Sequence, residues 1–122
     1  MAKGFVTRGV PLHGVGFEMH IDTTGYPTSS GLAQNIQALN ALGLQVHITE
    51  MDVRLPVDSN ENATAANLQA QAATYQRILT VCLQNPVPGS FPGYGAALPF
   101  DVNYQPKPAV ASVLPWPWCH PI

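Results

Sequence analysis

Charged side chains are scarce in this sequence. Only 10% of its 122 residues are charged, with five lysines and arginines against seven aspartates and glutamates, for a net charge of −2. The five basic residues are scattered, so they form no stripe that follows a phosphate backbone. The composition therefore argues against a nucleic-acid partner, and so low a charge gives little protection against self-association.

Long apolar segments are also missing. Hydrophobic residues make up 46% of the sequence, yet no segment approaches the roughly 20 consecutive apolar residues that a membrane span requires. The first residues contain no apolar core of the length that a secretory signal needs. We therefore expect no membrane partner and no signal peptide in this chain, and the residues alone leave its location unknown.

Metal-binding and cofactor-binding motifs are absent as well. No two of the four histidines have the i, i+4 spacing of a zinc-binding helix, and no glycine-rich segment joins a strand to a helix. We expect no metal site and no cofactor. The two cysteines, Cys82 and Cys119, can form one disulfide bond but are equally consistent with free thiols.

The apolar residues that are present alternate between two periodicities. Strand patterns cover residues 14–21 and 44–53, helical patterns cover residues 30–43 and 64–83, a helix ends near residue 9, and one more short helix covers residues 106–114. This order predicts an α/β fold with parallel strands. Ser30 and Thr64 suit helix N-caps, and Gly43 suits a left-handed helix end. We expect one domain over residues 1–114 and an irregular tail over residues 115–122.

The second strand pattern ends in two acids. Strict alternation along a strand places Val46, Ile48, Glu50 and Asp52 on one face. The two carboxylates then point the same way. Such a strand end either faces solvent or carries chemistry, and the pattern leaves both interpretations open.

The first strand pattern ends in a similar way. Gly16, Glu18 and His20 share one face, and the residues between them are apolar. If the two strands are neighbours, about 4.8 Å apart, Glu18 can approach Glu50 at the same end of the sheet. Two carboxylates so placed raise one pKa, which leaves one acid protonated as a proton donor and the other ionised as a nucleophile or base.

Three motifs together resemble family 10 glycoside hydrolases, the retaining endo-1,4-β-xylanases. They are Gly-Val-Gly-Phe-Glu-Met-His at residues 14–20, Val-His-Ile-Thr-Glu-Met-Asp at residues 46–52, and Pro-Phe-Asp-Val-Asn-Tyr-Gln-Pro-Lys-Pro-Ala at residues 99–109. The likeness covers about residues 3–114. It implies a fragment of a (β/α)8 barrel whose two strands are similar to the sixth and seventh, since 122 residues are too few for a whole barrel of about 250 residues.

The resemblance also implies roles for individual residues. Glu50 matches the catalytic nucleophile, His20 the histidine that hydrogen-bonds to it, and Asp52 the acid that orients this histidine. His47 and Tyr94 are the expected substrate-binding residues, and the substrate would be xylan or a xylo-oligosaccharide. Retaining hydrolysis needs a second carboxyl group about 5 to 5.5 Å from the first.

The chain departs from the family pattern in three places. The acid/base glutamate of the fourth strand, in an Asn-Glu motif, has no counterpart, and neither has the Thr-Trp-Gly segment of the eighth strand. The cysteine that partners Cys82 in many relatives is also missing. Glu18 stands where relatives usually carry glutamine, so it is the one visible candidate for the second acid.

The resemblance predicts a glycoside hydrolase that acts on β-1,4-xylan by a retaining mechanism and, like its family, is secreted. One alternative is a non-catalytic or weakly carbohydrate-binding relic of the barrel. Another is a different hydrolase, or a metal-assisted activity that uses the strand-end glutamates and histidines. Because two strands leave open edges and uncovered faces, we also expect a homo-oligomer.

Overall fold

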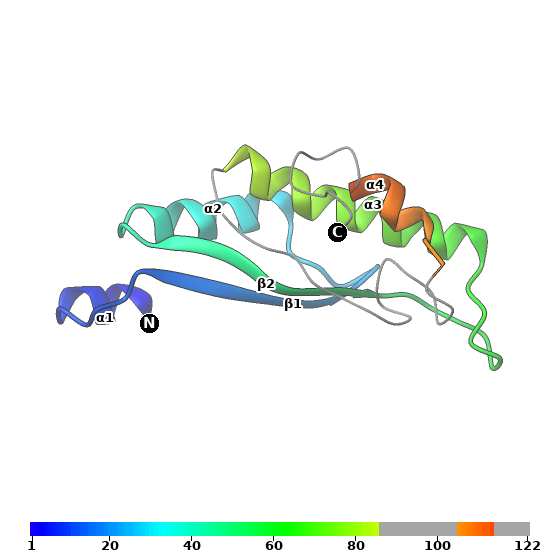
Figure 1. Cartoon of the computed structure of the whole chain (residues 1–122), viewed down its shortest axis with the longest axis horizontal. Coiled ribbons are helices and arrows are strands. Elements are labelled where there is room, and N and C mark those ends of the chain that lie inside the picture. The colour runs from blue at the N-terminus through cyan, green and yellow to red at the C-terminus, as the bar shows by residue number, and fades with distance from the viewer. Residues whose placement is uncertain (86–104, 114–122) are drawn as a thin grey trace.

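The computed structural model describes residues 1–85 and 105–113. In chain order the elements are α1 (Ala2–Thr7), β1 (Gly14–Asp22), α2 (Ser29–Asn40), β2 (Gln45–Arg54), α3 (Ala65–Gln84) and α4 (Pro108–Val113). The two strands form a parallel sheet. Figure 1 shows α2, α3 and α4 as a layer over one side of this sheet, with α1 beyond the start of β1. The prediction of an α/β fold with two parallel strands and flanking helices is confirmed.

Threonine residues are the N-caps of the two long helices. The Thr64 hydroxyl accepts a hydrogen bond from the Asn67 N–H at 3.1 Å, as expected for the N-cap of α3. The N-cap of α2 is Thr28, which accepts from the Gly31 N–H at 3.1 Å. The prediction of Ser30 was wrong, because extended backbone at Thr28 aims its hydroxyl at the helix, whereas Ser30 already lies inside the first turn.

The core lies between the sheet and the helices. Tyr75 and Ile78 of α3 and Ile36 of α2 are almost completely buried. They pack against the apolar residues of both strands, and each such side chain contributes about 1.5–3 kcal/mol when fully removed from water. Because the helices cover one face of the sheet, polar side chains of the two strands can reach water from the opposite face.

The pairing of the strands contains one irregularity. Phe17 of β1 pairs with Ile48 of β2, but the next residue of β1, Glu18, pairs with Glu50. Thr49 is therefore an extra residue on β2, which makes a β-bulge.

The bulge changes which residues of β2 face the helices. The buried residues of this strand are Val46, Ile48, Met51 and Val53. Alternation predicted that Glu50 and Asp52 share the face of Val46 and Ile48, and that prediction was wrong. Because Thr49 is inserted, the alternation shifts by one residue, and both acids lie on the face turned away from the helices.

Several predictions concern residues that the structure does not describe. The helix predicted over residues 106–114 is present as α4, whereas the tail over residues 115–122 and the boundary at residue 114 lie outside the described residues. Cys119 lies there too. Burial raises the pKa of the Cys82 thiol to about 11. None of the helices among the described residues is long and apolar enough to cross a membrane.

Candidate functional site

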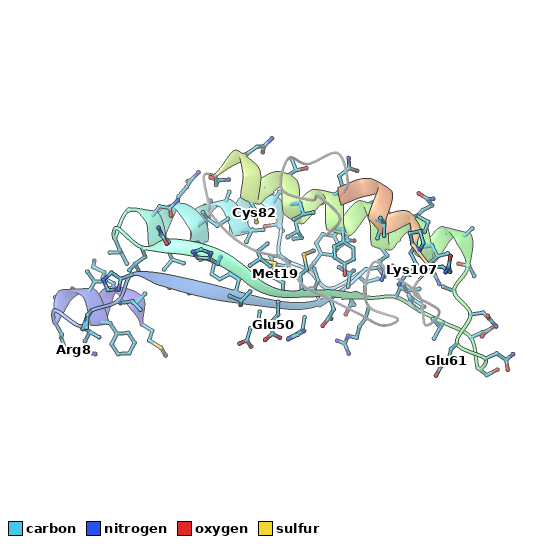
Figure 2. The ribbon with its side chains drawn as sticks, viewed as in Figure 1. Arg8, Met19, Glu50, Glu61, Cys82 and Lys107 are labelled. Atoms are coloured by element: carbon cyan, nitrogen blue, oxygen red, sulfur yellow. The ribbon has the colours of Figure 1, made fainter. Side chains whose placement is uncertain are left out.

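The candidate site lies on the face of the sheet opposite the helices. Figure 2 shows Glu50 projecting away from the helix layer, whereas Met19 lies on the helix side of β1. Glu18 pairs in register with Glu50. His20 pairs in the same way with Asp52. Because register-paired residues of neighbouring strands point to the same face, the strands bring these four polar side chains together.

His20 connects the two acids of β2. Its Nδ1 atom is hydrogen-bonded to Oδ2 of Asp52, and its Nε2 atom lies 3.1 Å from Oε2 of Glu50. The side chains of His20 and Glu50 are 52% and 55% exposed, whereas that of Asp52 is 23% exposed. The imidazole is therefore held from the more buried acid and presents its other nitrogen to the more exposed one.

The two acids favour the protonated form of His20. The hydrogen bond and negative charge of Asp52, and more weakly those of Glu50, raise the pKa of His20 above its ordinary value. When Nδ1–H donates to Asp52, Nε2 needs a proton of its own to donate to Glu50. The arrangement thus suits an imidazolium that donates to both carboxylates and leaves Oε1 of Glu50 free of this contact.

Helix α3 holds the backbone of β2 beside Asp52. The Gln71 side-chain amide is buried and donates to the Val53 carbonyl at 2.6 Å. The Tyr75 side chain is also buried. Its desolvation, and to a smaller extent the charge of Asp52, raise the pKa of its hydroxyl, whereas a hydrogen bond with the Val53 backbone lowers this pKa. The sequence did not predict the buried position of Gln71, because a glutamine on a helix usually faces water. Gln71 lies four residues before Tyr75, so the two side chains share one face of the helix, and this spacing was the sequence signal for its burial.

The remaining predicted site residues do not join this cluster. His47 pairs in register with Gly16, before the bulge, and its Nε2 lies 3.4 Å from Oε1 of Gln45. Tyr94 lies outside the described residues. Roles for His47 and Tyr94 in substrate binding therefore stay predictions.

A metal ion is not suggested by the side chains in view. Within residues 1–85 and 105–113, no group of three or more histidine, cysteine, aspartate or glutamate side chains has an arrangement that could hold one. This face supports the chemistry of a carboxylate, Glu50, that is oriented by His20 and paired in register with a second acid, Glu18.

Comparison with known proteins identifies one family. The sequence profile of Glycosyl hydrolase family 10 matches residues 1–115. Endo-1,4-beta-xylanase B of Thermotoga neapolitana is 40% identical over an alignment of 129 positions, gaps included, that covers 93% of this chain and 36% of that enzyme. Endo-1,4-beta-xylanase C of Phanerodontia chrysosporium is 32% identical, over 89% of this chain and 30% of that enzyme.

Solved structures agree with the sequence relatives. Xylanase 10B of Thermotoga maritima superposes with a TM-score of 0.80 and 36% identity, over 91% of this chain and 38% of that one. Xylanase 10B of Thermotoga petrophila, solved in complex with xylobiose, gives the same values. These neighbours are (β/α)8 barrels, so the expected correspondence to part of such a barrel is confirmed. The chain spans about a third of the length of the curated relatives it matches.

Proposed function

Since the chain belongs to glycosyl hydrolase family 10, we propose that it acts in hydrolysis of β-1,4-xylan by a retaining mechanism, with Glu50 as the nucleophile. The observation that carries the proposal is the His20 side chain, which contacts Glu50 on one side and Asp52 on the other. A xylo-oligosaccharide ligand is supported by the relative that was solved in complex with xylobiose.

Glu50 supplies the reactive oxygen. Its Oε2 atom is held by His20 at 3.1 Å, so Oε1 is the atom that attacks the anomeric carbon. The attack forms a covalent glycosyl-enzyme ester while the bond to the leaving oxygen breaks. His20 positions the carboxylate, and Asp52 positions His20. Neither of them takes part in forming or breaking a bond to the sugar.

Glu18 is the candidate for the second acid. It stands opposite Glu50 in the register of the sheet. Because the backbones of adjacent strands are about 4.8 Å apart, two carboxyl groups on one face can reach the separation of about 5 to 5.5 Å that retaining hydrolysis uses. Glu18 would give its proton to the leaving oxygen in the first step. In the second step a water molecule would give a proton to Glu18 while the water oxygen attacks the anomeric carbon, and the bond between this carbon and Glu50 breaks.

Hydrolysis of an aryl β-xyloside and of xylan tests both assignments. We expect Glu50→Gln to lose nearly all activity on both substrates, because the amide is a poor nucleophile. Glu18→Gln should slow xylan hydrolysis at least about a hundredfold but leave kcat/KM for an aryl β-xyloside nearly unchanged, because this ratio reports the first step and a good leaving group needs little protonation there. Glu61→Gln is the matched control, since Glu61 is an exposed acid in the loop beyond β2 (Figure 2).

Added azide separates the two roles. With Glu50→Ala, azide can enter from the face that the carboxylate vacates, so the product should be the α-xylosyl azide. With Glu18→Ala, azide should instead attack the glycosyl-enzyme and give the β-xylosyl azide. Full activity of Glu50→Gln would refute Glu50 as the nucleophile, and full xylan activity of Glu18→Gln would refute Glu18 as the acid.

Two other results would replace the proposal. If the protein binds xylo-oligosaccharides but releases no reducing sugar, the chain is a carbohydrate-binding relic of the barrel. If hydrolysis disappears on chelation and returns with an added divalent metal, the reaction is metal-assisted.

A further inference from the structure

The bulge at Thr49 determines where the acids of β2 lie. On the N-terminal side of the bulge, Val46 and Ile48 face the helices and are buried. Without the extra residue, the same alternation would continue and turn Glu50 and Asp52 toward the helices. The bulge is therefore the local feature that brings these two carboxylates to the face of His20.

Gly16 provides the space that the Thr49 side chain occupies. A Cβ atom on Gly16 would lie 2.7 Å from Cγ2 and 2.9 Å from Oγ1 of Thr49, both too close for non-bonded atoms. Contact with Cβ of Thr49 would be 3.4 Å, an ordinary packing distance. The Thr49 hydroxyl also donates to the Phe17 carbonyl at 3.4 Å. Thr49 thus lies across β1 at Gly16, where that strand has no side chain.

We propose that Gly16 is a positioning residue for the candidate site: its missing side chain leaves room for the extra residue Thr49, and the resulting bulge sets Glu50 and Asp52 against His20. The proposal rests on the proposed function only where it calls Glu50 a nucleophile. The positioning itself concerns the contacts of His20, which are measured without substrate.

Titration of His20 by NMR gives the direct test. In the unmodified protein the pKa of His20 lies above its ordinary value, because both acids contact the imidazole. We expect Gly16→Ala to displace Thr49 and to lower the pKa of His20 toward that value. The exposed His13 serves as the internal reference. Gly4→Ala is the matched control, since a Cβ atom there meets only Arg8, at 3.6 Å.

A second substitution identifies steric conflict as the cause. Thr49→Ala removes the two atoms that a Cβ on Gly16 would meet, so the double variant Gly16→Ala/Thr49→Ala should recover the His20 titration of the unmodified protein. If Gly16→Ala fails to fold, recovery of a folded spectrum in the double variant supports the pair. Failure of the double variant to recover either property overturns it.

Activity separates this proposal from the proposed function. In an active protein, Gly16→Ala should lower kcat by about tenfold to a hundredfold with little change in KM, because a displaced nucleophile reacts slowly with substrate that still binds. An inactive unmodified protein refutes the proposed function but leaves the His20 test intact. An unchanged His20 titration in a folded Gly16→Ala variant refutes the positioning role and leaves the proposed function untouched.

Discussion

At the scale of single residues, His20 is the group on which the candidate site depends. The pKa of His20 is raised most by the hydrogen bond and charge of Asp52, and less by those of Glu50. His20 therefore links the two acids: it is hydrogen-bonded to the partly buried Asp52 and lies against the exposed Glu50, so it fixes the Glu50 carboxylate relative to Asp52. An exposed carboxylate would otherwise sample several rotamers, and fixing one of them is the usual requirement for a nucleophile.

Substitution of Asp52 tests that order. Asp52→Asn should lower the pKa of His20 more than Glu50→Gln does, because the hydrogen bond and charge of Asp52 are the larger causes of its elevation. NMR titration of the imidazole measures both changes. An equal or greater fall with Glu50→Gln would contradict this order of effects.

The same linkage predicts how stability depends on pH. A histidine whose pKa is raised by folding stabilises the protein fully below its unfolded-state pKa, which is about 6.5. The contribution disappears as the pH rises through the higher folded-state pKa. The difference in urea midpoint between the unmodified protein and His20→Gln should therefore be larger at pH 5 than at pH 9, and a difference independent of pH would contradict this.

The sequence identified these residues only in part. Glu50, His20 and Asp52 were predicted from the motifs, and the His20 side chain contacts both acids. The face on which the acids lie could not be derived from simple alternation, because Val46 to Ile48 and Glu50 to Val53 each alternate correctly on their own. The signal lay between them, where two polar residues, Thr49 and Glu50, follow one another.

At the scale of elements, the helices and strands were largely predictable and their ends less so. Apolar spacing located α2 and α3 because each helix buries one stripe against the sheet. The N-cap of α2 was assigned two residues too late, since Thr28, Ser29 and Ser30 all have hydroxyl groups. Composition does not distinguish such neighbours. Only the backbone conformation decides which hydroxyl reaches the helix.

Removal of the cap tests which residue begins α2. Thr28→Ala should lower the free energy of unfolding by about 1 kcal/mol, because the Gly31 N–H loses its acceptor. Ser30→Ala is the matched control and should change it by less than about 0.5 kcal/mol. Urea denaturation followed by circular dichroism measures both. A larger loss with Ser30→Ala would restore the assignment made from sequence.

At the scale of the whole molecule, the sheet is incomplete by the standard of the barrels it resembles. Each strand pairs with the other along one edge, and within the described residues the sheet contains no third strand. An unpaired edge attracts further strands. The candidate site lies on the face opposite the helices, so under the proposed function a group that pairs with these edges also limits how a sugar chain can approach Glu50.

These edges and the weak net charge favour self-association. We expect this chain, studied by itself, to form dimers or larger assemblies, because edge pairing satisfies backbone groups and a charge of −2 opposes it little. Sedimentation equilibrium over a range of protein concentrations should give a mass above that of one chain, and xylan hydrolysis measured on the same size-exclusion peak shows whether the assembly is the active form. A single-chain mass at every concentration would contradict the prediction, and activity confined to a single-chain peak would show that the candidate site works without a second copy.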